Sequence, residues 1–308
     1  TEGKGLGAAT DSGFNASGEL ENGYTVGYFM SLDTDNAVTN TSAQMTIGMG
    51  SLGTLQYNVE AGSKANGIDD ITPNAYNETW DGLTTGAGTT VANTNNPSFF
   101  GASTASGSID YRIPAQEIMG TTVNASVTYD PNAGTGSASK GGVAAGVTNT
   151  GSGTAYTLQL AHESGVEFGG GLERINDDIG LTTAHGTENT TLYVKYAIEG
   201  LSAAYQIAYS DQANGTSTTD VVGADKEAKF YSAAYTMGDL TVSYGESELK
   251  TKAHSDTVAR PTIDLSSLQA AYTMGAMTIS AAMSETDNHG GVAAQNYDEN
   301  TISVSFAF

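Results

Sequence analysis

Four carboxylates and the only tryptophan of the chain are concentrated in a stretch that has a single basic residue. Residues 62–107 contain Lys64 as their one Lys or Arg. The side chains of this stretch that could attract or bind a ligand are Asp69, Asp70, Glu78, Trp80 and Asp81. Carboxylates without nearby bases create a negative field that attracts cations. The stretch therefore predicts a cation-attracting loop, and a solvated acidic loop is the alternative with the same composition.

Ionisable side chains at alternate positions form a second candidate group. Asp110 and Arg112 are separated by one residue, Tyr111, and in a strand this spacing puts both on one face. The same alternation places Lys195 on the polar face of its own predicted strand. Basic residues are few on these faces, so the sequence disfavours a site for anions.

Catalysis is not predicted by any of these residues. The four histidines are dispersed along the chain, and no Gly-x-Ser-x-Gly motif is present. Cysteine is absent, which removes thiolate chemistry and disulfides. We therefore expect neither an enzyme nor a required cofactor.

Structural calcium is the one metal that the sequence suggests. Hard cations take clusters of carboxylate and carbonyl oxygens. Short acidic groups that could supply them are Asp33 with Asp35, Asp69 with Asp70, and Asp177 with Asp178. None of these groups has the spacing of an EF-hand loop. The calcium ligands are thus a hypothesis, and the scattered histidines predict no transition-metal site.

The composition limits the fold class. The chain has 308 residues, a formal net charge of −23 and 38% hydrophobic residues, with no run near the ~20 apolar residues of a spanning helix. Its charge disfavours nucleic acids and anionic surfaces as partners and favours cations. Because no signal peptide is present, we expect a mature, exported chain.

Two-residue alternation of apolar and polar side chains recurs along most of the chain. In the last stretch Ile302, Val304, Phe306 and Phe308 alternate with small polar residues and Ala307. Two hairpins, 231–246 and 268–283, share the sequence Ala-Ala-Tyr-Thr-Met-Gly at the turn. Fifteen such strands can be counted, and together they predict an all-β protein.

Short turns alternate with long polar connections between these strands. Asn22-Gly23 and Gly200 mark tight turns, whereas the connections 130–153 and 211–225 are long and polar. Tyrosines fall at the ends of the apolar rows, as at a membrane interface. This combination is typical of a transmembrane antiparallel β-barrel with an apolar outside and a wet lumen. A soluble sandwich or surface adhesin would also alternate, but its apolar rows would meet in a dry core.

The chain resembles the general porins of bacterial outer membranes, of the sixteen-stranded type and closest to those of alpha-proteobacteria. The resemblance is carried by residues 110–114 (DYRIP), followed by a glycine turn and residues 123–129 (VNASVTY). It is also carried by the place of the longest loop, because residues 62–107 match the third outer loop, which folds into the barrel and narrows it. The whole of 1–308 is then one barrel domain with 62–107 as its constriction loop.

Several further expectations follow from this resemblance. It implies a passive channel for small hydrophilic solutes and ions in the outer membrane, in contact with lipid and lipopolysaccharide, and a homotrimer. Asp69, Asp70, Glu78, Trp80, Asp81, Asp110, Arg112 and Lys195 become the constriction residues. The excess of acid predicts cation preference. A sugar-selective channel with Trp80, Phe99 and Phe100 as an aromatic track is the alternative, and a non-conducting adhesin is a more distant one.

An odd number of strands does not close a single-chain barrel of this type. The sequence shows fifteen, and the strand that begins near Phe14 has the polarity expected of a second strand. We therefore expect sixteen strands, the first being degenerate within residues 1–10 or lying upstream of Thr1.

Overall fold

The computed structural model describes residues 11–33, 39–59, 63–79, 100–101, 107–131, 152–176, 187–211, 225–252 and 261–307. These residues form β-strands and three short 3-10 helices, η1 (Gly50–Leu52), η2 (Asn66–Ile68) and η5 (His289–Gly291). Among them no helix has the length and apolar character needed to cross a membrane.

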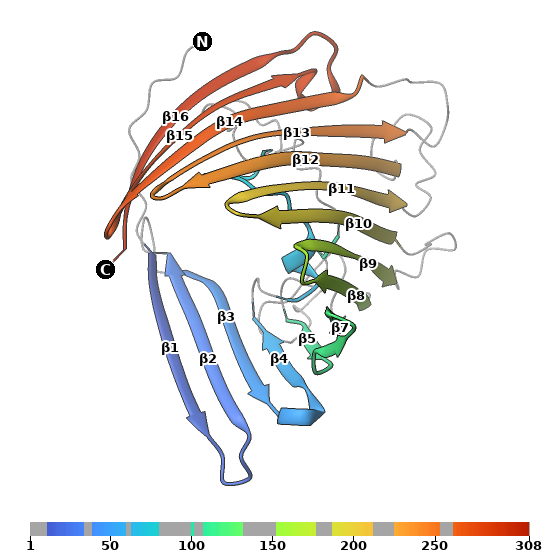
Figure 1. Cartoon of the computed structure of the whole chain (residues 1–308). Helices are drawn as coiled ribbons and strands as arrows, with labels where there is room; N and C mark the ends of the chain where they lie inside the picture. Colours follow the sequence, from blue (N-terminus) through green and yellow to red (C-terminus); the bar gives the residue numbers. More distant parts are fainter. Residues whose placement is uncertain are drawn as a thin grey trace. The chain divides into compact units, whose positions relative to one another are not determined.

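The strands of the described residues form one sixteen-stranded antiparallel sheet in which neighbours follow chain order (Figure 1). The strands up to the middle of the chain are β1 (Asp11–Glu19), β2 (Thr25–Asp33), β3 (Thr39–Gly48), β4 (Thr54–Asn58), β5 (Ile109–Arg112), β6 (Gln116–Ile118), β7 (Thr121–Asp130) and β8 (Ser152–His162). The others are β9 (Val166–Asn176), β10 (Thr187–Ile198), β11 (Leu201–Asp211), β12 (Asp225–Met237), β13 (Leu240–Lys252), β14 (Ile263–Met274), β15 (Met277–Asp287) and β16 (Tyr297–Phe306). The predicted all-β fold and its strands are confirmed.

Two compact units share the chain. The first consists of residues 1–69, 100–160 and 170–189, and the second of residues 70–99, 161–169 and 190–308. Strands β1 to β5 and β7 belong to the first unit and β11 to β16 to the second. The chain passes from one unit to the other at five places, the first of them between Asp69 and Asp70 inside the long loop. The prediction that 1–308 is a single domain therefore stays a prediction.

The short strand β6 was not expected from the sequence. It pairs with β7 on the same side as β5, so β5 and β6 are two pieces of one interrupted strand. Pro114 lies in the interruption, where it cannot donate a ladder hydrogen bond. With this pair counted once, the described residues occupy fifteen positions along the sheet, the number read from the sequence. Residues 1–10 and Phe308 lie outside the described part, so an additional first strand stays a prediction.

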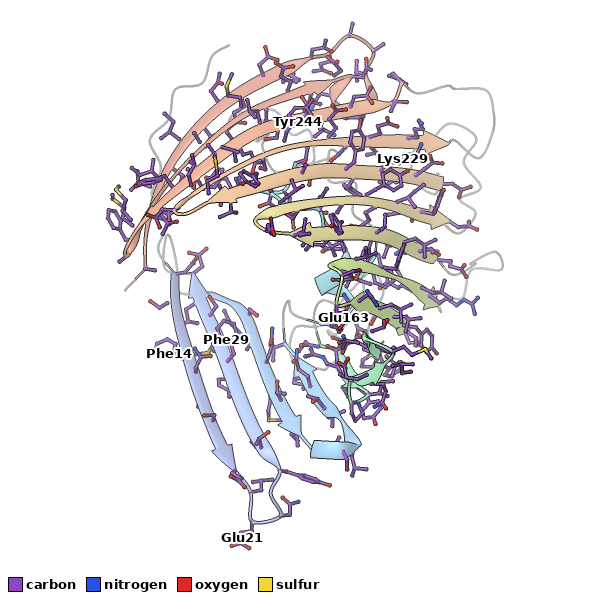
Figure 2. All side chains as sticks on the ribbon, viewed as in Figure 1. Phe14, Glu21, Phe29, Glu163, Lys229 and Tyr244 are labelled. Atoms are coloured by element: carbon purple, nitrogen blue, oxygen red, sulfur yellow. The ribbon has the colours of Figure 1, made fainter. Side chains whose placement is uncertain are left out.

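Burial along the strands is the reverse of that in a soluble protein. On β14, Leu268 is 53% and Tyr272 42% exposed, whereas Ser267 is 2% and Gln269 4% exposed. On β16 the contrast is weaker: Ile302 is 79% exposed, and its neighbour Ser303 is partly exposed. Side chains stand on both faces of the strands (Figure 2), and the exposed face is the apolar one. We call the two surfaces the apolar face and the polar face.

This distribution decides between the two fold classes that alternation allowed. In a soluble sandwich the apolar rows would be buried and the polar rows exposed. Here the large apolar side chains are exposed row by row, which is the surface that a lipid bilayer covers in a β-barrel. An apolar cluster of Ala208, Ala228, Phe230, Leu249, Ile263 and Leu265 is the buried exception, at the long-loop ends of β11 to β14.

Tight turns join the hairpins at the other strand ends. At the β10–β11 turn, Glu199 and Gly200 both have positive φ, 44° and 84°. A Cβ on Gly200 would lie 2.6 Å from the carbonyl oxygen of Thr236, so only glycine fits beside the neighbouring strand. This turn, predicted from Gly200, positions the polar faces of β10 and β11 next to each other.

The connection between β15 and β16 is held by a small set of local contacts. Asn288 donates its side-chain amide to the carbonyl of Thr262 at 2.9 Å, and its Oδ1 accepts the backbone N–H of Ala294 at 3.0 Å. His289 is 3% exposed, and its ring meets Tyr297 edge to face at 4.8 Å. Burial lowers the pKa of His289, so the folded loop favours the neutral imidazole.

The stability of this loop should therefore fall in acid. A histidine whose folded pKa lies below its unfolded value contributes stability at neutral pH and loses it as the pH falls through its ordinary value near 6.5. Hydrogen exchange of residues 288–296, corrected for intrinsic rates, should show faster opening at pH 5 than at pH 7.5. The variant His289→Phe keeps a ring beside Tyr297 and should give a flat profile, whereas equal pH dependence in both proteins would refute this account.

Candidate functional site

A segment of the long loop that forms no strand lies on the polar face of β11 to β14. We call residues 71–79 the strap. Its backbone is bound by one side chain from each of the four strands: Gln206, Ser232, Ser243 and Gln269. All these residues belong to the second unit. The loop that interrupts the strand pattern is thus fixed against the wall along this segment.

The two serines bind the middle of the strap. Ser232 on β12 donates its hydroxyl to the carbonyl oxygen of Pro73 at 2.5 Å. Ser243 on β13 accepts the backbone N–H of Ala75 at 2.8 Å. The strap passes close to β13 at Gly245, where an added Cβ would lie 2.5 Å from the hydroxyl of Thr79. The small residues of this face therefore make room for a second layer of chain.

The two glutamines bind the strap at its ends. Gln206 accepts the N–H of Ile71 at 2.9 Å and donates to Thr191 at 2.7 Å, and it is fully buried. Gln269 accepts the N–H groups of Tyr76 and Asn77 at 2.9 and 3.2 Å and donates to the carbonyl of Asn77 at 2.7 Å. A buried amide that satisfies both its donor and its acceptor in this way holds the chain without charge.

A charged network supports the start of the long loop in the first unit. Asp110 is fully buried on β5 and accepts hydrogen bonds from the N–H of Lys64 at 2.7 Å and from the hydroxyl of Thr128. Arg112 lies 3.3 Å from the same carboxylate and donates to Gln56 at 2.9 Å. The predicted Asp110 and Arg112 pair on one strand face is thus present. Asp110 holds the loop, and the part-exposed Arg112 is the member that water can reach.

The far end of the long loop is also fixed within the first unit. Phe100 is 1% exposed and lies directly over Gly171 of β9, while Glu173 accepts the N–H of Gly101 at 3.1 Å. Asn189 donates to the same oxygen of Glu173 at 2.8 Å. A Cβ on Gly171 would overlap the phenyl ring. Glycine is therefore required at position 171 for the ring of Phe100 to occupy this place.

Replacing Gly171 with valine should displace Phe100 and loosen this end of the loop. Since the ring cannot share its space with a branched side chain, we expect a loss of about 1–3 kcal/mol in the free energy of unfolding. Fluctuations of the open-channel current should rise at the same time, because the loop lines the passage that we propose below. Gly27→Val on β2 is the control, since a Cβ there meets only ordinary contacts. Unchanged current in Gly171→Val would argue against a role for this anchor.

The other residues predicted for the site are placed as follows. Asp69, Asp70 and Glu78 are partly exposed, and Asp70 Oδ1 accepts the N–H and hydroxyl of Thr72 at 2.7 and 2.6 Å. Lys195 is partly exposed on the polar face of β10. Trp80 and Asp81 lie outside the described residues, so their roles stay predictions.

Sequence reasoning missed the residues that hold the loop. Gln206, Gln269 and Glu173 are polar-face residues whose importance comes from the loop atoms they bind. The sequence did contain one signal for this contact. The residues at the four binding positions on β11 to β14 are glutamines and serines, which can bind a backbone without charge.

No group of three His, Cys, Asp or Glu side chains suited to a metal ion occurs among the residues that the structure describes. Asp33 lies at the end of β2 opposite Asp11, and Asp35, Asp177 and Asp178 lie outside the described ranges. The calcium hypothesis therefore stays a prediction.

Comparison with known proteins identifies the same architecture. A family model described as Gram-negative porin matches residues 1–308. No curated protein sequence matches the chain.

Two solved structures illustrate the likeness in fold. OmpF of Salmonella typhi, in complex with daunomycin, has 14% identity and a TM-score of 0.67, over 99% of this chain and 93% of that one. The anion-selective porin from Comamonas acidovorans has 14% identity and a TM-score of 0.65, over 98% and 90%. At this level of identity the likeness concerns the fold.

Proposed function

Because the chain belongs to the Gram-negative porin family, we propose that it is a diffusion channel whose passage prefers cations and is narrowed by residues 62–107. Membership places the protein in the outer membrane and supports a general diffusion channel. The proposal adds the constriction, the sign of the selectivity and the residues that set it.

The observation that carries the proposal is the strap on the polar face of β11 to β14. The polar face of a porin wall is the one that borders water, and a loop bound there narrows the water-filled cross-section. The strap is flanked by Asp70 and carries Glu78, both partly exposed. A narrow aqueous passage in a low-dielectric wall strengthens the field of such carboxylates.

The charge balance supports cation preference. The chain has a formal net charge of −23, and the strap residues 71–79 include no Lys or Arg. Arg112 is compensated by Asp110, which leaves Lys195 as the predicted constriction base with no ion pair among the described residues. The fold alone does not fix the sign, since one structural neighbour is named an anion-selective porin. The sign must come from the side chains of this chain.

The other partners follow from the same proposal. We expect lipid on the exposed apolar face, lipopolysaccharide at its outer border and a homotrimer as the working assembly. Small hydrophilic solutes and cations are the expected permeants.

The reversal potential in a KCl gradient tests the selectivity. The wild-type channel should reverse on the cation-selective side, and Asp70→Asn with Glu78→Gln should roughly halve the K⁺ to Cl⁻ permeability ratio, because two carboxylates leave the constriction. The control Glu248→Gln with Glu285→Gln removes the same charge from the opposite face and should leave the ratio unchanged. An anion-selective wild type, or equal effects of both double variants, would disprove the proposed charge set.

A sugar-selective channel is the alternative reading of the long loop. It needs exposed aromatic faces, and Phe100 is 1% exposed against Gly171, which weighs against its part in such a track. Trp80 and Phe99 lie outside the described residues. Liposome swelling with sugars of graded size should follow size alone, while saturation or stereochemical preference would favour the alternative.

A further inference from the structure

We propose that Gln269 and Gln206 are positioning residues that set the distance between strap and wall, and so the width of the passage. The inference rests on the proposed function, because it concerns the same constriction. It goes beyond that proposal by naming two uncharged side chains that hold the strap against the wall. Among the contacts between described residues, Gln269 makes three hydrogen bonds to the strap and Gln206 makes one, so the tests concentrate on Gln269.

The strap and the wall have matching periods. Alternate strap residues 71, 73, 75 and 77 are bound in turn by β11, β12, β13 and β14, so the strap advances by two residues for each strand. Residues 75–77 of the strap form bends, so the direction of the crossing follows from the strand register and not from the length of the strap.

The strand register shows that the strap crosses the strands obliquely. Gln206 faces Phe230, which lies two residues before Ser232 on β12. Ser232 faces Gly245, which lies two residues after Ser243 on β13. The binding positions therefore shift twice toward the short turns.

No further shift occurs at the last step, because Ser243 faces Gln269 directly. Over three strand steps the binding positions thus shift by four residues toward the short turns. One side chain from each strand binds the strap along this oblique line.

Gln269 both accepts hydrogen bonds from the strap backbone and donates one to it, as the backbone of a neighbouring strand would. Its Oε1 accepts the N–H groups of Tyr76 and Asn77, and its Nε2 donates to the carbonyl of Asn77 and to Ser267. It is 4% exposed, so water does not substitute for these bonds. A glutamate would keep the acceptors and lose the donor, and a methionine would lose both at similar volume.

The first test measures single-channel conductance and open-channel current noise. Gln269→Met should raise the conductance and increase the noise several-fold, because the strap leaves the wall near β14 or fluctuates there. Ser243→Ala, which removes one hydrogen bond, should act in the same direction but less. Gln44→Met makes the same exchange of glutamine for methionine on the polar face of β3, a strand of the first unit. This control should behave as wild type.

Gln269→Glu gives a readout that a merely structural role would not produce. At neutral pH its carboxylate would face the carbonyl of Asn77, whereas the protonated acid has both a donor and an acceptor, as the amide does. Relative to wild type at each pH, its noise should be high at pH 8 and return toward wild type at pH 4. This profile also decides the matter if Gln269→Met does not fold.

The outcomes separate this inference from the proposed function. A wild type that does not conduct contradicts the channel itself. A conducting wild type, with Gln269→Glu equal to it at every pH and Ser243→Ala without effect, overturns the positioning role alone.

Discussion

Replacing Ala270 with arginine is expected to destabilise the protein in the bilayer by up to about 2–4 kcal/mol, the cost that a lipid-facing arginine reaches at the midplane. Ala270 lies on the apolar face of β14, between Leu268 and Tyr272. Its cross-strand neighbours are Val242 on β13 and Ala281 on β15. No acidic side chain is among these neighbours, so the guanidinium would have no partner there. Urea-induced folding and unfolding in liposomes measures the difference directly.

The next residue provides a matched control. Ala271 is the same residue type on the same strand, but it projects from the polar face and is partly exposed. Ala271→Arg should cost less than about 1 kcal/mol, since water is available on that side. A larger cost for Ala271→Arg than for Ala270→Arg would mean that the faces are reversed and that the apolar rows form a dry core.

Replacing Asp110 with valine is expected to lower the free energy of unfolding by about 2–3 kcal/mol, because buried donors lose a charged acceptor. The N–H of Lys64, the hydroxyl of Thr128 and the guanidinium of Arg112 all bind this carboxylate. The side chain of Arg112 is 32% exposed, so water can compensate part of the loss at that partner. Unfolding in liposomes again gives the magnitude.

Asp110→Asn removes the charge but keeps the shape of the side chain, so it shows how much of the stability depends on the charge. The amide keeps an acceptor for the N–H of Lys64 and should recover more than half of the stability lost in Asp110→Val. It should also release Arg112 from its ion pair, which would reduce the cation preference. If the asparagine variant lost as much stability as the valine variant, the network would depend on the charge alone.

The strands could be predicted because their signal is local. Alternation at period two identifies a strand from its own side chains, and tight turns such as Asn22-Gly23 fix where each hairpin reverses. Strand β6 was missed because its three residues are too short for a pattern and follow Pro114. The division of the chain into two compact units had no sequence signal.

The functional site could be predicted only in part, for a physical reason. Asp110 and Arg112 are two residues apart, so their common face follows from strand geometry. Gln206 and Gln269 matter through loop atoms more than a hundred residues away in sequence, as the bond from Gln206 to Ile71 shows. Which polar-face residue meets which loop residue depends on the register of four strands. That register is a property of the folded sheet.

A conductance recording from the purified chain in a planar bilayer tests the central claim most directly. The claim is that an apolar exterior and a polar interior enclose a water-filled passage. The account predicts stepwise conductance increases as single channels insert, with a current that is ohmic and carried mainly by K⁺ in KCl. A bilayer that stays insulating, while the folded protein is shown to be inserted in it, would contradict the account.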